Sequence, residues 1–445
     1  MDETYPDPLA IKPFTRPVKG SVEVPGSKSI TNRMLIIACM ADHPVELTGA
    51  LFSDDSHYMV ECLKKLGFEV TPNAAEKTIR VSGTSGNITE ESASLYVGVA
   101  GTAARFLTAF CATRKGGQFT IDGTEQMRKR PMKGLLDALK SQGTEIESND
   151  DFLPVTLKPS GLKGGRIQLE TSASTQLLSA LLMVAPLAEE DLEIEIRGGA
   201  EKKPFVKLTQ ELMYRFGQPH QVIEPLGNES VLLRIKSGIP YSIPETVAIE
   251  PDASAASYFL TLPLVVGGSV TVKGLHSDAL QGDYAYTKVL KEIGMTIEES
   301  SEGTTASVTL KTLPCDGIEK NFWPISDTFL TLAAVSPVLK GVTKLSGIGH
   351  TRHQESDRIA AMANELIKLG QWIEEGDDFI EIHPGLIVPS EVMTYHDHRV
   401  AMSFGILGCF NLYADGSPWL KIADPGCCAK TFPDFFTVLD QLRIT

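Results

Sequence analysis

The sequence predicts an α/β protein in which one structural unit is copied six times. A compound pattern recurs about every 70–80 residues along the chain. Each copy contains an apolar helix and a second helix, and strand-like segments such as SVTVKG and TIRVSG lie between them. A period of this length fits one supersecondary unit, so the repeat itself indicates the fold class.

The first helix of each copy is the more apolar one. In RFLTAFCAT, LLSALLMVAPLA and RVAMSFGILGCF, apolar residues nearly surround the helix, which predicts burial on most sides. These helices are expected to begin near Ser29, Thr102, Ser174, Ser254, Asp327 and His398.

The second helix of each copy is amphipathic. MKGLLDALKSQG and IAAMANELIKLG carry Leu, Ile or Met on one face and charged residues on the other, and both close on Gly. The series is expected within residues 49–67, 123–143, 199–217, 274–294, 347–370 and 424–442. Each unit therefore supplies one buried and one half-exposed helix.

A chain of 445 residues is too long for one ordinary core. The junction most marked by proline lies in the middle, around SIPETVAIEPDAS. We expect two domains of three units each, one formed by residues 25–248 and a discontinuous one formed by 1–24 and 249–445. A first crossing near Val22–Pro25 would place the N-terminal strand with the C-terminal half.

The composition limits the classes of partner. Lys and Arg total 41 and Asp and Glu total 56, which gives a net charge of -15 and argues against nucleic acid or anionic lipid. The acidic, proline-interrupted N-terminus does not resemble a targeting peptide, and no apolar run is long enough to span a bilayer. Seven cysteines without a CxxC motif suggest buried thiols in a reducing compartment. We expect a soluble, cytoplasmic monomer.

Basic residues gather at or near the starts of the repeat helices. A helix start presents unpaired N–H groups and a partial positive charge, so it already favours anions. Added cations there predict a site for more than one negative group. The residues are Lys28, Arg105, Arg128, Lys202, Arg358, Arg399 and Lys430.

The segment VPGSKSITNRMLI carries the first candidate residues. Ser27, Lys28 and Ser29 offer hydroxyls and an ammonium group at a helix start, and Arg33 lies one turn further on the same face. A capped helix with a solvated lysine is the alternative interpretation. The segment lacks the GxxxxGK[ST] pattern, so it predicts no nucleotide.

The second and third copies add small and hydroxyl residues. In GVAGTAARFL, Gly101 lets a ligand approach the backbone and Arg105 follows, although small residues also serve close helix packing. In SASTQLLSALLM, the hydrogen-bonding side chains exceed what one helix cap requires. They are Ser172, Ser174, Thr175 and Gln176.

The fifth and sixth copies carry carboxylates. Asp327 opens an apolar helix, where a simple N-cap is the alternative interpretation. Glu355 and Arg358 share a helix face and could form an ion pair. His396 and His398 flank an aspartate, but this spacing without a third separated ligand does not predict a metal site.

The motifs together resemble one family, the 5-enolpyruvylshikimate-3-phosphate (EPSP) synthases. The phrases VPGSKSxxNR, AGTAAR, RPMKGLLDAL, STQLLSALLM, EPDASAASYF, ESDR, DHRVAM and KTFPDFF follow the family order from about Lys12 to Leu442. The resemblance implies a two-domain inside-out α/β barrel with six βαβαββ repeats, three per domain. It also implies transfer of the enolpyruvyl group of phosphoenolpyruvate to the 5-hydroxyl of shikimate 3-phosphate, with no metal or organic cofactor.

The resemblance assigns roles residue by residue. Lys28 would serve in proton transfer, Asp327 would accept the hydroxyl proton, and Glu355 would assist protonation of the methylene carbon. Shikimate 3-phosphate would contact Lys28, Ser29, Arg33, Ser174, Thr175, Gln176, Lys202, Asp327 and Gln354. Phosphoenolpyruvate would contact Lys28, Gly101, Gln126, Arg358, Arg399 and Lys430.

The chain departs from the family pattern at several positions. The family often has Asn at Val99, Arg at Gln126, Ser and Tyr at Lys202 and Phe205, Asn at His350, and Lys at Gln354. Two cations are thereby lost, and Lys202, Arg128 or Arg352 could compensate. These departures mark either a divergent branch or a paralogue that acts on a related ring, and the retained acid, base and cations favour the branch.

Two other functions are weighed against this one. The UDP-N-acetylglucosamine enolpyruvyl transferases share the architecture but place a cysteine in a loop of the second repeat, and GTEQMRKRPM has none. Ser29 also stands where that family usually has Asn. A non-catalytic repeat scaffold would need neither an acid and a base nor clustered cations at helix starts.

Overall fold

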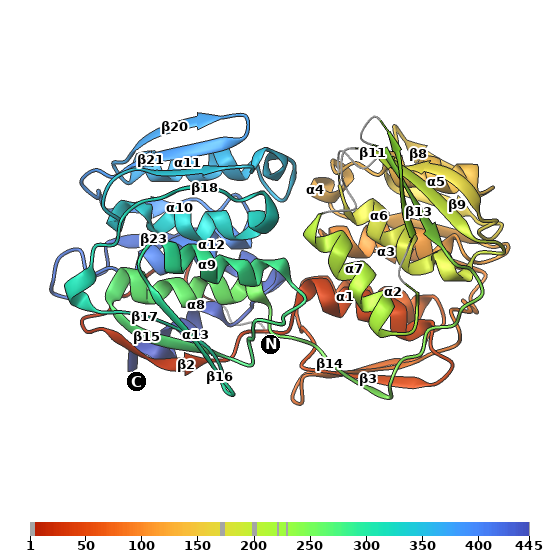
Figure 1. Cartoon of the computed structure of the whole chain (residues 1–445), viewed down its shortest axis with the longest axis horizontal. Helices are drawn as coiled ribbons and strands as arrows, with labels where there is room; N and C mark the ends of the chain where they lie inside the picture. Colours follow the sequence, from red (N-terminus) through yellow and green to blue (C-terminus); the bar gives the residue numbers. More distant parts are fainter. Residues whose placement is uncertain (1–4, 170–173, 198–202, 220–221, 228–229, 445) are drawn as a thin grey trace. The chain divides into compact units, whose positions relative to one another are not determined.

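The chain forms two compact units in the computed structural model, which describes residues 5–169, 174–197, 203–219, 222–227 and 230–444. Unit 1 comprises Met1–Pro25 and Glu250–Thr445, and unit 2 comprises Gly26–Ile249. Figure 1 colours the chain along its sequence and labels the elements of each unit.

The described residues of unit 2 form three four-stranded sheets, each with one parallel pair followed by antiparallel neighbours. The first sheet has the order β14 (Thr246–Ala248), β3 (Pro44–Thr48), β5 (Thr78–Ser82) and β4 (Val70–Asn73). The second has the order β6 (Ser92–Tyr96), β7 (Gln118–Asp122), β9 (Phe152–Lys158) and β8 (Glu145–Asn149). The third has the order β10 (Gly165–Leu169), β11 (Leu192–Arg197), β13 (Ser230–Ile235) and β12 (Val222–Gly227).

The helices of unit 2 form the two expected series. The apolar series is α1 (Lys28–Cys39), α3 (Gly101–Cys111) and α6 (Gln176–Val184), followed by η1 (Ala185–Leu187). Every residue of α3 is buried, as its all-round apolar pattern predicts, and α1, α3 and α6 contact one another. The amphipathic series is α2 (Asp54–Lys65), α5 (Lys133–Ser141) and α7 (Pro204–Arg215), with a short α4 (Glu125–Arg128) before α5.

Where unit 1 is described, it forms two four-stranded sheets and one three-stranded sheet. The first has the order β16 (Thr296–Ser300), β17 (Gly303–Val308), β15 (Gly268–Lys273) and β2 (Val18–Val22). The second has the order β18 (Glu319–Asn321), β19 (Thr343–Ser346), β21 (Phe379–His383) and β20 (Trp372–Gly376). The third has the order β1 (Leu9–Ala10), β23 (Leu420–Ile422) and β22 (Ser390–Val392).

The helices of unit 1 repeat the same two series. The apolar series is α8 (Ala253–Val266), α10 (Phe329–Val335) and α12 (His398–Leu407), and the amphipathic series is α9 (Tyr286–Glu292), α11 (Arg358–Lys368) and α13 (Phe435–Ile444). Short 3-10 turns join them: η3 (Gly282–Ala285), η4 (Leu310–Thr312), η5 (Trp323–Thr328), η6 (Ser336–Val338), η7 (Gly349–His353) and η8 (Pro425–Lys430).

The chain passes between the units twice. Just before each passage lies a strand whose partners in its sheet are distant in the sequence. β2 precedes the first crossing and lies parallel to β15 of unit 1. β14 precedes the second crossing and lies parallel to β3 of unit 2. Each unit therefore takes one strand of its first sheet from a distant part of the sequence.

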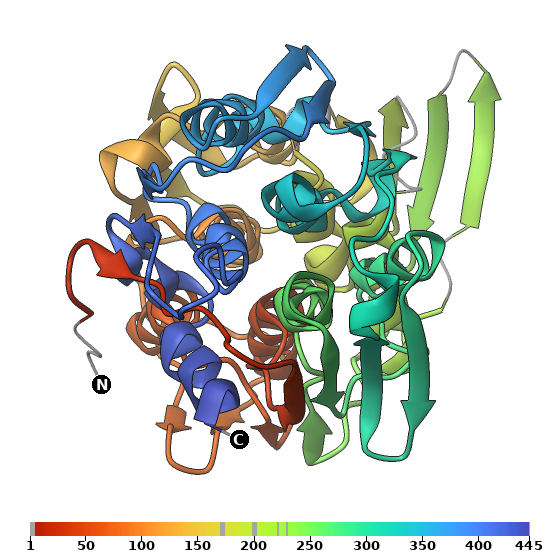
Figure 2. The ribbon, with the colours of Figure 1, turned by 90° about the vertical axis from the view of Figure 1, so that its left-hand side faces the viewer.

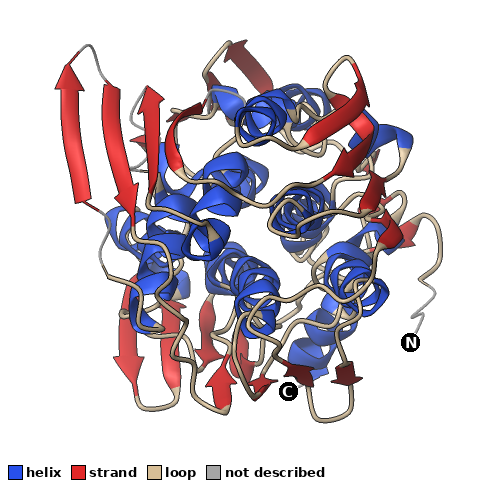
Figure 3. Ribbon diagram, turned by 90° about the vertical axis from the view of Figure 1, so that its right-hand side faces the viewer, coloured by secondary structure: helices blue, strands red, loops and turns tan. Residues whose placement is uncertain are grey.

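In each unit the helices lie inside and the sheets lie outside. Figure 2 faces unit 1 and Figure 3 faces unit 2, and both views show helices end-on with strands toward the periphery. This arrangement follows from the burial pattern, because helices that are apolar all round need protein on every side. In the part of the chain that is described, no helix combines the length and apolar character that a membrane span needs.

Candidate active site

A network of ion pairs in unit 1 collects six of the expected site residues. Its centre is Arg358, the first residue of α11, whose side chain is 2% exposed. Its guanidinium binds Asp327 at 3.0 Å, Glu355 at 2.9 Å and Asp397 at 2.8 Å, and it also donates to the side-chain oxygen of Gln354. The expected pairing of Glu355 with Arg358 is confirmed.

Two further cations complete this network. Arg399 binds the second carboxylate oxygen of Asp327 at 2.8 Å, and Lys430 binds Oε1 of Glu355 at 2.8 Å. Each candidate acid–base carboxylate is therefore held between two cations. We call this set the unit 1 charge network: Asp327, Gln354, Glu355, Arg358, Asp397, Arg399 and Lys430.

Helix starts position the cations of the unit 1 charge network. Asp397 is the N-cap of α12 and accepts from the backbone N–H of Arg399 at 2.9 Å. The same carboxylate accepts from Nε of Arg358, so one buried side chain joins the starts of α11 and α12. Lys430 closes η8, the 3-10 turn that Pro425 begins.

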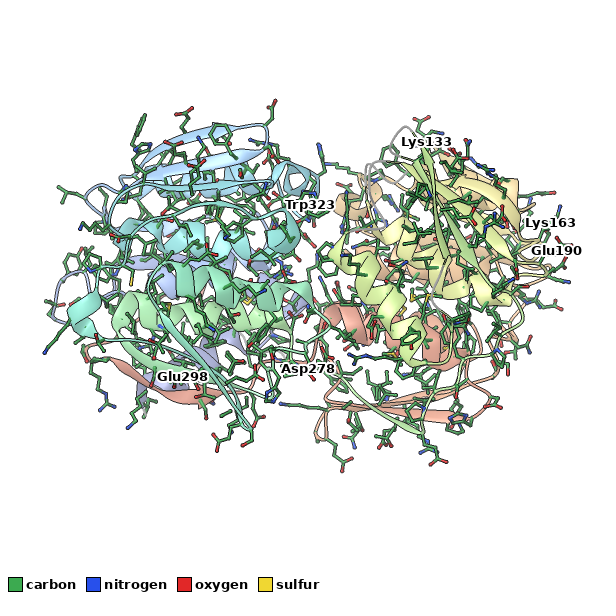
Figure 4. All side chains as sticks on the ribbon, in the orientation of Figure 1. Lys133, Lys163, Glu190, Asp278, Glu298 and Trp323 are labelled. Atoms are coloured by element: carbon green, nitrogen blue, oxygen red, sulfur yellow. The ribbon has the colours of Figure 1, made fainter. Side chains whose placement is uncertain are left out.

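Asp327 is not the cap of an α-helix. It lies in η5, and α10 begins two residues later with Thr328 at its N-cap and no side-chain cap bond. Figure 4 labels Trp323, the residue at which η5 begins. The N-cap interpretation of Asp327 is wrong because Thr328 is the N-cap of α10, and the two carboxylate oxygens of Asp327 bind Arg358 and Arg399.

The carboxylates keep the two arginines charged. Burial alone would lower the pKa of Arg358, but Asp397, Glu355 and Asp327 raise it above its ordinary value. Burial opposes the charge of Arg399 in the same way, and Asp327 contributes most to raising its pKa. These cations therefore remain charged although they are withdrawn from water.

A buried carboxyl that the sequence did not single out lies beside this network. Asp283 in η3 accepts a hydrogen bond from Oγ of Ser254 at 2.9 Å. Burial and the neighbouring charge of Asp327 raise its pKa to about 7. The only indication in the sequence is an isolated acidic residue in QGD, whose neighbour Gln281 accepts from the N–H of Ala253 at the start of α8.

In unit 2, the start of α1 places Lys28 as predicted. Ser27 caps the helix by accepting from the N–H of Ile30. Nζ of Lys28 lies 3.6 Å from Oδ2 of buried Asp55, and its side chain remains 16% exposed. The lysine thus keeps a face toward solvent at the first turn of the helix.

Arg33 points into the interior of unit 2. Its Nε donates to Oγ1 of Thr209 at 2.7 Å, Nη1 donates to the carbonyl of Ser29 at 2.8 Å, and Nη2 donates to Oγ of Ser179 at 3.2 Å and to the carbonyl of Phe205 at 3.1 Å. Burial lowers its pKa to about 9. One side chain thereby joins α1, α6 and α7.

At the start of α6, one of the expected hydroxyl groups, that of Ser174, binds the backbone of the helix itself. Oγ of Ser174 accepts from the N–H of Gln176 at 3.2 Å, whereas Thr175 at the N-cap makes no side-chain cap bond. Oε1 of Gln176 is buried without a hydrogen-bond partner among the described residues. Ser172 and Lys202 lie outside the described residues.

The start of α3 reveals a cation that the sequence analysis missed. A Cβ atom added to Gly101 would lie 2.7 Å from Nη1 of both Arg105 and Arg130, so two guanidinium groups lie against this backbone. Nη1 of Arg130 also donates to the carbonyl of Val99 at 3.4 Å. The RKRP segment before α5 is the sequence feature that could have pointed to it.

Arg128 and Arg352, which the sequence analysis offered as replacements for the two lost cations, are each paired with carboxylates. Arg128 pairs with Asp122 at 2.6 Å, and Arg352 pairs with Asp357 at 2.8 Å and Glu375 at 3.2 Å. Arg130 lies against the backbone of Gly101, whereas Arg128 is paired with Asp122.

Three other positions at which the chain departs from the family pattern are His350, Phe205 and Gln354, and each makes a contact within its own unit. Nε2 of His350 lies 2.9 Å from Oγ of Ser326, next to Asp327. The backbone carbonyl of Phe205 accepts a hydrogen bond from Arg33, and Oε1 of Gln354 accepts one from Arg358.

The histidines near α12 do not assemble a metal site. His396 lies 2.6 Å from Asp424, and His398 is fully buried beside Asp397. Within the residues that the structure describes, no group of three or more His, Cys, Asp or Glu side chains could hold a metal ion.

The fold is similar to that of a class of known proteins, the enolpyruvyl transferases. Two solved structures share the fold: "EPSP Synthase" from Acinetobacter baumannii, with a TM-score of 0.78 and 23% identity over 97% of each chain, and "the enolpyruvyl transferase NikO" from Streptomyces tendae, with a TM-score of 0.73 and 16% identity over 98% of each chain.

Sequence comparison identifies the family. The family model "EPSP synthase (3-phosphoshikimate 1-carboxyvinyltransferase)" matches residues 14–439. A relative from Opitutus terrae named "3-phosphoshikimate 1-carboxyvinyltransferase" is 49% identical over 444 residues, covering 98% of each chain. The chain belongs to the EPSP synthase family.

Proposed function

We propose that this chain is a 3-phosphoshikimate 1-carboxyvinyltransferase. It transfers the carboxyvinyl (enolpyruvyl) group of phosphoenolpyruvate to the 5-hydroxyl of shikimate 3-phosphate and releases phosphate. Family membership over nearly the whole chain supports the reaction. The observation that carries the assignment of residues is the unit 1 charge network, in which Arg358 joins both candidate proton-transfer groups.

The reaction needs one proton removed from oxygen and one delivered to carbon. Asp327 is proposed to accept the proton of the 5-hydroxyl, and Glu355 with Lys28 is proposed to serve the protonation of the methylene carbon. Asp327 and Glu355 are bound to the same guanidinium, that of Arg358, which favours action on the same centre.

The cations are proposed to bind phosphoenolpyruvate. In the unit 1 charge network, Arg399 binds Asp327 and Lys430 binds Glu355. A phosphate and a carboxylate compete for these cations because both offer charge-assisted hydrogen bonds. Binding of substrate would therefore release the two carboxylates at the moment when proton transfer requires them.

Unit 2 is proposed to bind shikimate 3-phosphate through the helix starts of α1 and α6. The residues are Lys28, Ser29, Arg33, Ser174, Thr175, Gln176 and Lys202, with Asp327 and Gln354 of unit 1. At the start of α3, the N–H of Gly101 and the guanidinium of Arg130 are proposed to contact phosphoenolpyruvate. The expected contact of Gln126 stays a prediction.

The acceptor distinguishes this proposal from its alternatives. UDP-N-acetylglucosamine is the alternative acceptor, and the family match favours shikimate 3-phosphate. The test is phosphate release from phosphoenolpyruvate with each acceptor in turn. We expect release with shikimate 3-phosphate alone. Release with UDP-N-acetylglucosamine alone would overturn the proposal, and release with neither would favour a scaffold.

A cytoplasmic location and a monomeric state are also proposed. The seven cysteines form no disulfide, and six of them are buried, which fits a reducing compartment. Sedimentation at several protein concentrations tests the monomer, and a mass that rises with concentration would contradict it.

A further inference from the structure

The buried guanidinium of Arg33 is surrounded by neutral partners. Its partners are two hydroxyl oxygens and two backbone carbonyls, and in the described part of the chain it has no carboxylate partner. Arg358, by contrast, binds three carboxylates. A buried arginine without a counter-charge is costly to the fold, so its neutral surroundings call for a reason.

We propose that Thr209 and Ser179 are positioning residues that orient Arg33 and leave its charge uncompensated for an anionic substrate. The proposal rests on the function proposed above, in which that substrate is shikimate 3-phosphate. Neither residue was singled out in the sequence, because Thr209 and Ser179 lie within α7 and α6 and not at their starts.

The two hydroxyls and one carbonyl form a closed set of bonds. Oγ1 of Thr209 accepts from Nε of Arg33 and lies 2.8 Å from the carbonyl of Phe205 and 2.9 Å from Oγ of Ser179. Oγ of Ser179 lies 3.4 Å from the same carbonyl. When the hydroxyls donate to this carbonyl or to each other, their lone pairs face the guanidinium.

This set fixes the plane of the guanidinium. Thr209 and Ser179 are fully buried, and the ring of Phe106 lies 5.2 Å below the central carbon of Arg33. Four of the five N–H groups of Arg33 have acceptors in the described structure, and one N–H of Nη1 has no acceptor among the described residues.

A neutral set of acceptors serves binding better than a carboxylate would. Hydroxyl and carbonyl oxygens satisfy the donors but do not cancel the charge. An incoming anion therefore interacts with the full charge in surroundings of low dielectric, where the attraction is strong. A carboxylate in the place of either hydroxyl would compete with the substrate for the same guanidinium.

The test compares four variants with the parent. Thr209→Val removes the acceptor of Nε at nearly constant volume, and Thr209→Ser keeps it. Ser179→Ala removes the acceptor of Nη2 with less change in packing. Thr108→Val is the matched control, because Thr108 is also a buried helical threonine that bonds the carbonyl four residues before it, yet Ala104 is its partner and Arg33 is not.

The measurements are the dissociation constant for shikimate 3-phosphate by calorimetry and the KM of each substrate. We expect Thr209→Val and Ser179→Ala to raise the dissociation constant and KM for shikimate 3-phosphate about tenfold, because each loses an acceptor of a charged donor. Their kcat and their KM for phosphoenolpyruvate should change less than about twofold, as uniform binding predicts. Thr209→Ser and Thr108→Val should resemble the parent.

Two results would overturn the inference alone. Unchanged binding of shikimate 3-phosphate by folded Thr209→Val or Ser179→Ala would remove these residues from its recognition. An equal loss in kcat and in both KM values, without rescue by Thr209→Ser, would assign them to the stability of the fold. Failure of the parent itself to bind shikimate 3-phosphate would instead overturn the proposed function together with the inference.

Discussion

Asp327 illustrates how a single side chain carries the proposed chemistry. Its two oxygens bind Arg358 and Arg399, each at 3.0 Å or less, and Thr328, not Asp327, is the N-cap of α10. A carboxylate held between two cations is well oriented, but it can act as a base only when a substrate anion takes over one of those cations.

The first prediction is that Asp327→Asn lowers kcat by about 10²-fold or more, because an amide cannot accept the hydroxyl proton. Steady-state kinetics with saturating substrates measure this. Asp357→Asn is the matched control, since Asp357 caps α11 and asparagine caps about as well. Turnover of Asp327→Asn equal to that of the control would remove Asp327 as the base.

The second prediction concerns Lys28, which pairs with Asp55 and keeps a solvent-facing side. Lys28→Met keeps the aliphatic stem and removes both the charge and the proton, so turnover should fall about 10²–10⁴-fold while the fold survives. Lys64→Met, at an exposed lysine paired with Glu61, should leave turnover unchanged. Circular dichroism checks the fold, and a folded Lys28→Met with normal turnover would exclude Lys28 from the mechanism.

The third prediction follows from the pKa of Asp283, which burial and the charge of Asp327 raise to about 7. Between pH 4 and 7 the folded protein holds a proton that the unfolded chain has lost, so this group costs stability progressively as the pH rises through that range. Asp283→Asn should remove the cost and keep an acceptor for Ser254. Urea unfolding at pH 4.5 and at pH 8 measures the free energy of unfolding of both proteins. The difference, variant minus parent, should be more positive at pH 8 than at pH 4.5 by about 1–3 kcal/mol.

Three charged groups near Asp283 act on its carboxyl and contribute to the pKa that this measurement tests. Asp327 and Asp252 repel its charge and Arg399 attracts it. The difference between variant and parent cancels the titration of more distant groups. A difference in stability that is the same at both pH values would show that Asp283 has the same protonation state in the folded and unfolded chain.

At the scale of elements, the helix starts explain why the cations gather. Arg358 and Arg399 occupy the first and second positions of α11 and α12, and the carboxylate of Asp397 joins the two starts. In unit 2, Nδ2 of Asn32 donates to Oγ1 of Thr102 at 2.7 Å, which joins the second turn of α1 to the first turn of α3. Repeating one unit therefore repeats one kind of anion-attracting helix start.

The fourth prediction distinguishes Arg130 from its neighbours in sequence. Arg130→Met should raise KM for phosphoenolpyruvate about tenfold or more, because a guanidinium that contacts an anion contributes a charge-assisted bond. Arg128→Met should have little effect, since Arg128 is exposed and pairs with Asp122. Gln126→Ala measures the expected contact of Gln126. A larger effect for Gln126 than for Arg130 would restore the sequence-based assignment.

The fold class could be predicted because each repeat can be recognised from local patterns of apolar residues and glycines in the sequence. All-round apolar sequences such as that of α3 and closing glycines at the amphipathic helices located both helix series. The two-residue strand β1 was not predictable, since only its pairing with β23 defines it. The apolar run after Asp327 predicted a helix that begins at this residue, whereas Asp327 lies in a 3-10 turn and α10 begins two residues later. Arg130 and Asp283 were missed because their roles depend on contacts with residues distant in sequence.

For the whole molecule, the proposed reaction draws on residues of both units, between which the chain passes twice. Lys28 and Arg33 of unit 2 and Asp327 and Glu355 of unit 1 must reach the same pair of substrates. The fifth prediction is that saturating shikimate 3-phosphate reduces the radius of gyration, because anionic substrate relieves repulsion between the basic helix starts. Small-angle scattering measures this, and an unchanged radius with binding confirmed would contradict it.

The central claim is that a carboxyvinyl group moves from phosphoenolpyruvate to the 5-hydroxyl of shikimate 3-phosphate. Phosphorus NMR of the reaction, combined with mass spectrometry of the acceptor, tests it most directly. The account predicts that the phosphoenolpyruvate signal is replaced by inorganic phosphate while the acceptor keeps its own phosphate and gains one carboxyvinyl group for each phosphate released. Release of phosphate with an unchanged acceptor, or no reaction at all, would contradict it.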